Sequence, residues 1–258
     1  MRLYFKYVSI HLKSQMQYKS SFFFNTLGQF LVAFATFLSI SFLFARFDSV
    51  GGFTYEEVLI CFAVMITAFS LGEAVGRGFD RFPLLLGNGG FDRALVRPRN
   101  VIFQVLASQM EFSRFGRLLQ AVFIFVYVIP QSDINWTFER VMTLVLMIVC
   151  GAFLFFGLFV IYAAFSFFTV EGLEFMNILT DGAREHGRLP FSVYGDGILK
   201  FLTFVVPIAL VQYYPLLFLI GREDSLFFAF APLFSLLFLL PCYILFRFGM
   251  KSFKSTGS

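Results

Sequence analysis

The sequence predicts an all-α, polytopic membrane protein with six transmembrane helices in one transmembrane domain, residues 1–258, and with the N- and C-termini cytoplasmic. Hydrophobic residues make up 59% of the 258 and charged residues 14%, whereas a soluble domain carries about 25% charged residues. Uncharged stretches recur along the whole chain at about 20 residues, the length that a helix needs to cross a bilayer. The basic residues gather on alternate connections between these stretches. Composition, length and charge therefore give the same fold class.

Six stretches are expected to span the membrane. The first lies between Lys19 and Arg46. The third has an apolar part of residues 118–129, which is short, so we expect it to begin within residues 113–117. Phenylalanine, present 42 times, gives these spans bulk that packs without adding a polar atom. In order, the spans cover about residues 22–45, 58–75, 118–129 with its extension, 141–170, 201–220 and 226–246.

The distribution of Lys and Arg predicts the orientation. With six spans, both termini lie on one side, together with the connections of residues 76–112 and 171–200. These four segments, with the start of span three, hold 17 of the 20 basic residues, and only Arg46, Arg140 and Arg222 remain for the other side. Positive residues are retained on the cytoplasmic side of a membrane. Both termini and the two long connections are therefore expected in the cytoplasm.

Residues 1–20 predict an amphipathic helix at the membrane interface. On a helical wheel, Arg2, Lys6 and Lys13 share one face with Ser9, and an adjacent apolar stripe runs beside them. The stripe consists of Phe5, Val8, Leu12 and Met16. The alternative is a basic tail whose charges only set the topology.

The sequence offers little for catalysis, metal binding or nucleic-acid binding. Cys61, Cys150 and Cys242 each lie in an apolar run without paired spacing, and His11 and His186 are isolated. Neither a phosphate-binding G-x-x-x-x-G-K-[ST] loop nor a Ser/His/Asp set occurs. Basic residues scattered over many short segments do not form a nucleic-acid face. We therefore expect a protein that is not itself an enzyme.

Ionisable groups inside the spans would indicate an ion-coupled carrier. Spans one, four, five and six have none in their central parts. Glu73 and Glu111 come closest, each near a cytoplasmic boundary beside arginine, and Glu111 with Arg114 three residues later is expected to be a helix-surface pair. An ion-coupled secondary transporter is accordingly the third choice, after a transporter powered by another chain and a passive channel or membrane scaffold.

The connection of residues 76–112 is the most informative segment. Residues Gly87 to Gly90 form a flexible break in the chain, and Pro98 would end a helix that begins after this break. A short helix is therefore expected near residues 90–98. Phe91 and Leu95 lie one turn apart, as do Arg93 and Arg97. A helix with an apolar knob and a basic edge suits docking in a groove of a soluble partner. The alternative is a hairpin on the inner leaflet whose arginines only anchor the topology.

The run GFDRALVRP of residues 90–98, followed by Phe103 to Leu106, resembles the G-x-F-D-x-x-L-x-R-P segment of type 2 ABC (ABC-2) exporter permeases. It is similar to a bacterial six-span subfamily without an assigned substrate. Residues 188–194, with Pro207 and Pro215 downstream, resemble that subfamily's entry into span five, where these prolines could permit a kink. Residues 253–258 resemble its closing Tyr-x-Ser-Thr-Gly, with Phe253 in place of the tyrosine. The likeness covers the chain in span count and loop placement.

The resemblance implies a permease of the bacterial plasma (inner) membrane that pairs with a second permease chain, identical or homologous. It also implies a separate P-loop subunit that holds ATP and Mg, and no cofactor in this chain. The coupling helix that meets this subunit would be carried by Phe91, Asp92, Arg93, Leu95 and Arg97, with Pro98 at its end. Phe91 and Leu95 would transmit motion by packing, while Asp92 and Arg97 would fix the register.

Overall fold

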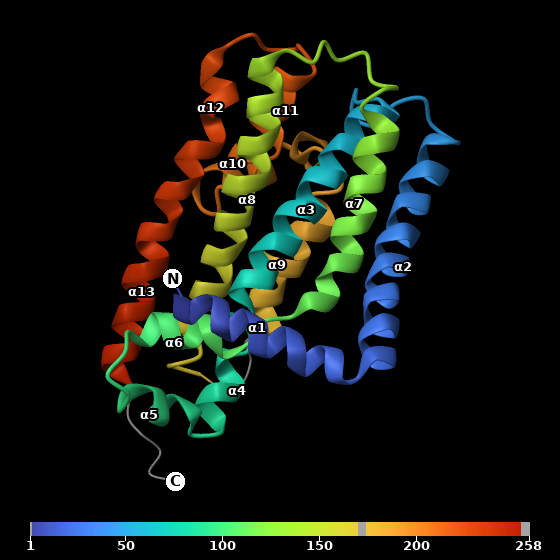
Figure 1. Cartoon of the computed structure of the whole chain (residues 1–258). Coiled ribbons are helices and arrows are strands. Elements are labelled where there is room, and N and C mark those ends of the chain that lie inside the picture. The colour runs from blue at the N-terminus through green and yellow to red at the C-terminus, as the bar shows by residue number, and fades with distance from the viewer. Residues whose placement is uncertain (1, 170–173, 254–258) are drawn as a thin grey trace.

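The computed structural model describes residues 2–169 and 174–253, which form a bundle of helices (Figure 1). Val170 at the expected end of span four, residues 171–173 of the second connection and the closing residues 254–258 lie outside the described residues. The α-helices are α1 (Arg2–Gln17), α2 (Lys19–Phe44), α3 (Tyr55–Asp80), α4 (Phe82–Gly87), α5 (Gly90–Leu95), α6 (Val101–Ser108), α7 (Phe115–Val128), α8 (Phe138–Phe165), α9 (Glu174–His186), α10 (Asp196–Phe204), α11 (Tyr213–Leu219), α12 (Leu226–Ser235) and α13 (Leu239–Ser252). The 3₁₀ turns are η1 (Phe112–Arg114), η2 (Phe191–Tyr194), η3 (Ile208–Leu210) and η4 (Leu236–Phe238).

Four helical segments are long and apolar enough to cross a membrane: α2, α3 with α4, α8, and α12 with α13. They coincide with predicted spans one, two, four and six. Their starts depend on local chemistry. The Thr54 hydroxyl accepts a hydrogen bond from the Glu57 N–H and the Glu57 carboxylate accepts one from the Thr54 N–H, a capping box that begins α3. Thr137 caps α8 in a similar way through the Arg140 N–H.

The third predicted span is short in the structure. Helix α7 has 14 residues, about 21 Å at 1.5 Å per residue, and η1 precedes it directly. Among the described residues it does not reach the length of the four long segments. It lies alongside α2 and α3 (Figure 1).

The fifth predicted span, residues 201–220, is not one continuous helix. The chain bends by 89° between α10 and the η3–α11 segment. Pro207 lies in the break, where it cannot donate a backbone hydrogen bond. Pro215 lies in the first turn of α11, where a missing N–H is tolerated. A hydropathy pattern sees only the apolar run and not this change of direction.

Helix α9 also departs from the prediction, which placed residues 171–200 in a connection at the cytoplasmic end. It runs antiparallel to α3. The Arg184 guanidinium lies 4.7 Å from the Phe69 ring centroid, and the Cys61 thiol lies 3.5 Å from the carbonyl of Gly187. Further on, Val193 packs against Gly51, in the turn before α3. The chain from Arg184 to Val193 therefore runs alongside α3 over most of its length.

Gln212 fixes this segment to the bundle. Its amide nitrogen donates to the carbonyl of Leu189 at 2.7 Å, and its amide oxygen accepts from the Phe191 N–H at 3.3 Å. The same nitrogen lies 2.7 Å from the Cys61 sulfur. Because the side chain is fully buried, these contacts replace water for the backbone groups involved.

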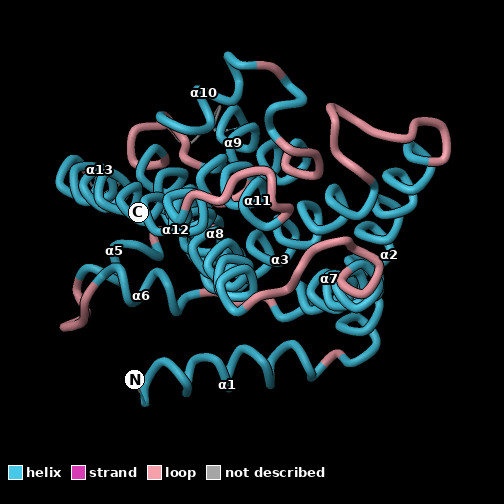
Figure 2. Tube along the Cα trace, turned by 90° about the horizontal axis from the view of Figure 1, so that it is seen from above, coloured by secondary structure: helices cyan, strands magenta, loops and turns pink. Residues whose placement is uncertain are grey.

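The bundle has two distinct ends, which we name the α5 end and the opposite end. The α5 end carries α1, α4, α5 and α6, while the opposite end carries the short connections after α2, α7 and α11 (Figure 1). Helix α1 lies crosswise to the long helices (Figure 2). At the opposite end, Arg222 donates to the Gly52 carbonyl at 2.6 Å and pairs with Glu57 at 2.8 Å.

Helix α3 is central and α2 is peripheral. In the most apolar part of the α3–α4 segment 78% of the residues are buried, whereas in that of α2 only 17% are. Since the exposed face of α2 is apolar, it is suited to lipid or to another apolar surface.

A phenylalanine cluster closes the α5 end of the core. It joins α3, α4 and α5 to the end of α8 and to α13. The ring centroids of Phe82 and Phe91 lie 5.1 Å apart, and those of Phe91 and Phe253 lie 5.0 Å apart, both edge-to-face. Such edge-to-face pairs add to the free energy of apolar burial. The cluster consists of Phe79, Phe82, Phe91, Phe167, Phe246 and Phe253.

A glycine permits the contact between α2 and α7. A Cβ placed on Gly116 would overlap the backbone carbonyl of Thr26, and small residues at such crossings let helices approach closely. We expect Gly116→Ala to lower the free energy of unfolding by about 1–3 kcal/mol, measured as a lower melting temperature in detergent micelles. Gly28→Ala on α2 is the control, because no atom lies within 4 Å of its added Cβ. Equal melting temperatures for the two variants would contradict this packing.

Candidate functional site

The short helix α5 lies within residues 76–112, the connection that the sequence marks as most informative. Gly89, with φ of 61°, turns the chain into it, a conformation that glycine adopts readily. Asp92 lies in its first turn, where a negative charge favours the helix dipole. The helix ends at Leu95, and Pro98 comes three residues later in an exposed turn.

The residues around α5 divide between the core and the surface. Phe91 is fully buried in the phenylalanine cluster, so it is not the exposed apolar knob that the sequence suggested. Leu95 is 43% exposed and Val96 83% exposed, and the side chains of Arg93 and Arg97 are exposed beside them. Asp92 is half-buried. The surface that α5 presents is therefore Leu95 and Val96 with a basic border.

Helices α5, α6 and α1 are hydrogen-bonded together. The Gln104 side chain donates to the carbonyl of Ala94 at 2.9 Å. From α1, a ring nitrogen of His11 lies 3.0 Å from the carbonyl of Ala107. The Gln15 oxygen accepts from the Phe112 N–H at 3.0 Å. A displacement of α5 would therefore reach both α1 and the start of α7.

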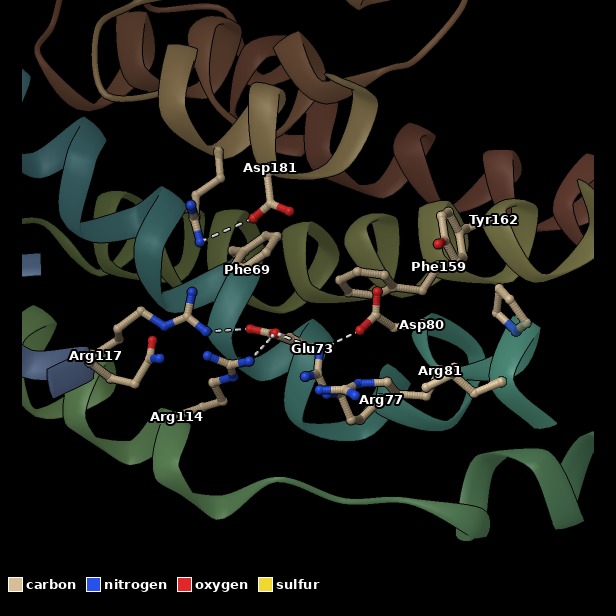
Figure 3. Close-up of a pocket in the computed structure, with 14 residues that line it drawn as sticks. Phe69, Glu73, Arg77, Asp80, Arg81, Arg114, Arg117, Phe159, Tyr162 and Asp181 are labelled. Carbon is tan, nitrogen blue, oxygen red and sulfur yellow. Dashed lines mark hydrogen bonds and ion pairs between the residues drawn. The ribbon is translucent and has the colours of Figure 1, made fainter. Parts of the chain in front are cut away.

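A polar cavity of about 510 Å³ lies beside this unit, between α3, α4, α7, α8 and α9 (Figure 3). Five arginines from separate parts of the chain line it, with three carboxylates. Its apolar walls come from aromatic rings on α3 and α8. The lining residues are Gln29, Phe69, Glu73, Arg77, Asp80, Arg81, Pro83, Leu84, Arg114, Arg117, Phe159, Tyr162, Asp181 and Arg184.

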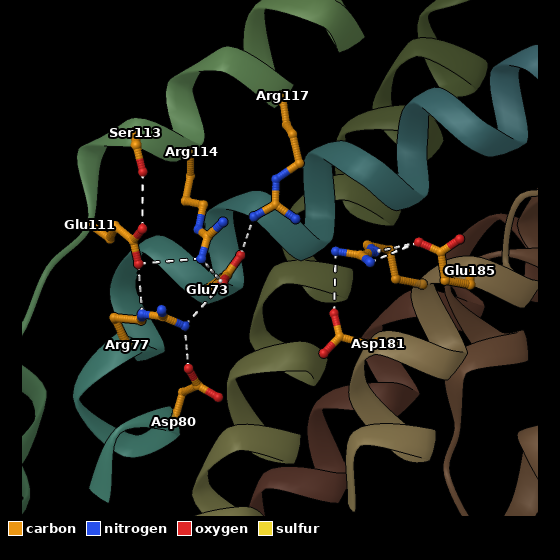
Figure 4. A network of polar contacts seen from close by, with 10 residues as sticks. Glu73, Arg77, Asp80, Glu111, Ser113, Arg114, Arg117, Asp181 and Glu185 are labelled. Atoms are coloured by element: carbon orange, nitrogen blue, oxygen red, sulfur yellow. Dashed lines mark hydrogen bonds and ion pairs between the residues drawn. The ribbon is translucent and has the colours of Figure 1, made fainter. Parts of the chain in front are cut away.

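One wall of the cavity is an ion-pair network centred on Glu73 (Figure 4). Glu73 pairs with Arg114 at 2.9 Å, with Arg77 at 3.3 Å and also with Arg117. Arg77 continues the network to Asp80 and, at 2.8 Å, to Glu111. The Glu73 carboxylate thus joins α3 to η1 and α7, the elements directly after α6.

The network gives Glu73 and Glu111 different surroundings from those that the sequence suggested. The Glu111–Arg114 pair exists at 3.3 Å, but Glu111 has extended backbone before η1 and is not on a helix surface. Burial raises the pKa of the Glu111 carboxyl, and Arg77 and Arg114 outweigh this and hold the pKa below its ordinary value. Glu73 and Arg117 lie 44 positions apart in the chain. Such a separation leaves no periodic signal, so sequence patterns did not reveal this site.

Helix α9 contributes the opposite wall of the cavity. Arg184 pairs with Asp181 at 3.3 Å and with Glu185 at 2.7 Å, and Arg188 pairs with Glu185. These pairings give the charged side chains of this polar helix partners on the helix itself. Because of these charges, a search of the sequence for apolar stretches does not detect α9.

The cysteines do not contribute to this cavity. All three are free and buried, and none of them is among the residues that line it. In the part of the chain that the structure describes, no group of three or more His, Cys, Asp or Glu residues could hold a metal ion.

Comparison with known proteins identifies a family. A family model described as an ABC-2 family transporter protein matches residues 30–257. Comparisons with curated proteins and with solved structures found no match. The matched residues include α3 to α13, and with them the α5 helix and the whole lining of the arginine-rich cavity except Gln29.

Proposed function

We propose, since this chain belongs to the ABC-2 transporter family, that it is the permease of an ATP-driven exporter. Its family and its apolar helices make it the multi-pass membrane component of an ABC transporter. More finely, we assign it to a bacterial plasma-membrane exporter in which two permease chains form the path. A separate P-loop subunit binds ATP with Mg and hydrolyses it, and this chain is not an enzyme.

We further propose six crossings with both termini in the cytoplasm. The first four are α2, α3 with α4, η1 with α7, and α8, and the sixth is α12 with α13. The fifth is α9 with the chain that follows it to η2, supported by its course along α3 from Asp181 to the contact of Val193 with Gly51. The bent α10–α11 pair then folds back at the opposite end. The α5 end faces the cytoplasm in this arrangement, with Arg93, Arg97 and Arg99 beside α5.

The coupling surface is formed by Leu95 and Val96, with Arg93 and Arg97 as its basic border. Two exposed apolar side chains at the end of a short helix fit a groove on a soluble subunit. Phe91 holds α5 on the phenylalanine cluster, Asp92 favours its first turn, and Pro98 ends the exposed stretch. Motion of the partner would pass through Gln104 and η1 to the Glu73 network as a rigid-body change.

The observation that carries the proposal is the family match over residues 30–257. It is tested by purifying the tagged chain from its native membrane in mild detergent. We expect a subunit with a G-x-x-x-x-G-K-[ST] loop to co-purify, and vesicles holding both chains to hydrolyse ATP. Identification of the partner by mass spectrometry and its stoichiometry would check this. A chain that purifies alone and conducts solutes without ATP would favour a passive channel and contradict the proposal.

A further inference from the structure

The charge on the cavity wall is unbalanced. Five guanidinium groups face three carboxylates among the residues that line it. Glu111 and Glu185 pair with some of these arginines but do not line the cavity. The surface that a ligand would meet therefore carries excess positive charge, within walls that include Phe69, Phe159 and Tyr162.

Two of the five arginines are available to a ligand. Arg77, Arg114 and Arg117 are held by the Glu73 network. Arg81 is exposed, and no carboxylate among the described residues lies within 4.0 Å of its guanidinium. Arg184 pairs with Asp181 and Glu185, whose side chains are themselves exposed to solvent. Pairs of that kind are weak and exchange readily.

The deeper wall also holds more donors than acceptors. Arg117 is only 4% exposed, and its Nε has no hydrogen-bond partner in the described part of the structure, as is also true of the Nε of Arg114. A buried donor without a partner is costly. These two Nε–H groups therefore lack acceptors, which an anion near Arg117 would supply.

A narrower cavity of about 40 Å³ continues from the first. The two share Gln29, Arg117 and Arg184. Beyond the shared residues, its wall combines Thr36, Glu185 and Arg188 with apolar side chains of α2 and α3. This wall includes Val32, Ala33, Phe62 and Ile66. At about 40 Å³ the narrower cavity has room only for a group about the size of a water molecule, next to Arg117 and Arg184.

We propose that the arginine-lined cavity binds an oxyanion of phosphate or carboxylate type, through Arg81 and Arg184 with Arg117 behind them. Guanidinium groups match these anions with paired, charge-assisted hydrogen bonds, and the cavity volume lies in the usual range for ligand sites. The inference rests on the proposed function, because in a permease with a cytoplasmic α5 end this cavity opens on the side from which an exported molecule enters. An anionic group is then a feature of the exported molecule.

Binding can be measured on the purified permease alone by isothermal titration calorimetry in maltoside micelles. The probes are inorganic phosphate and dodecyl phosphate, with dodecyltrimethylammonium as the amphiphile of opposite charge. We expect saturable binding of a phosphate probe, weakened about tenfold or more by Arg81→Gln with Arg184→Gln. Arg46→Gln is the matched control, because Arg46 is exposed near the opposite end. Comparing variants cancels the partition of the amphiphile into micelles.

The probes also identify the source of the anion. Binding of both phosphates supports the site and indicates a free anion, whereas binding of dodecyl phosphate alone supports it and indicates the head group of an amphiphile. If the double variant fails to fold, Arg81→Gln alone gives the same comparison, and Arg81→Lys, which keeps the charge without the paired donors, should bind with an affinity between those of wild type and Arg81→Gln. Equal affinity of wild type and arginine variants, or no saturable phosphate binding, would overturn the inference. Since no ATP-binding subunit is present, this result is independent of the co-purification test.

Discussion

Replacing Glu73 by glutamine is expected to destabilise the bundle more than any other single charge removal on α3. The change leaves Arg114 and Arg117 without their shared carboxylate in a buried site. Breaking a buried ion pair on one side costs about 3–5 kcal/mol, because the remaining charge stays desolvated. The expected result is a large fall in the melting temperature of the purified protein in detergent micelles, measured by fluorescence-detected size exclusion after heating.

Two further variants make the Glu73 experiment specific. Glu139→Gln is the control, since Glu139 is exposed in the first turn of α8 and its loss should cost at most about 1 kcal/mol. Removing Arg117 together with Glu73, as Glu73→Gln with Arg117→Met, should restore part of the loss because it removes one uncompensated charge. A Glu73→Gln protein as stable as Glu139→Gln would show that the network contributes nothing to the fold.

Replacing Val96 by aspartate is expected to weaken coupling to the ATP-binding subunit strongly while leaving the permease folded. Val96 is almost fully exposed on the proposed coupling surface. A charge introduced there would have to be desolvated in an apolar groove. We expect association with the partner, measured by co-purification, and stimulated ATP hydrolysis in vesicles to fall about tenfold or more, the equivalent of about 1.4 kcal/mol. The melting temperature should not change.

Phe91→Ala, unlike Val96→Asp, should lower the melting temperature of the permease. Because Phe91 is fully buried, the variant leaves a cavity and should lose about 3–5 kcal/mol of stability.

Phe47→Asp is the matched control for Val96→Asp, because Phe47 is an exposed apolar residue in the connection after α2. Normal coupling in the Val96→Asp protein would exclude Leu95 and Val96 as the coupling surface.

Sequence patterns found the features that depend on local composition. Apolar length located α2, α3, α8 and the α12–α13 segment, and the Gly87–Gly90 break with Pro98 enclosed the stretch that contains α5. The spacing of Phe91 and Leu95 could not show that one is buried and the other exposed, since this depends on Phe167 and Phe253 far along the chain.

Features that depend on tertiary contacts were not predictable. Helix α9 carries Asp181, Arg184 and Glu185, so its sequence reads as a polar connection, and its course along α3 depends on contacts such as that of Arg184 with Phe69. The bend at Pro207 interrupts an apolar run that has the length of one span. The cavity needs residues from six helices, and its arginines appear in the sequence only as topology signals.

The phenylalanine cluster bears on how abruptly the protein could switch. Six rings that interlock edge-to-face have few intermediate arrangements of low energy, because a small slide separates several pairs together. The α5 end should therefore resist small displacements and then yield cooperatively once a threshold force is reached. In kinetic terms, small thermal movements of the partner subunit would not shift the α5 end, and conformational changes of the permease without ATP hydrolysis would be rare.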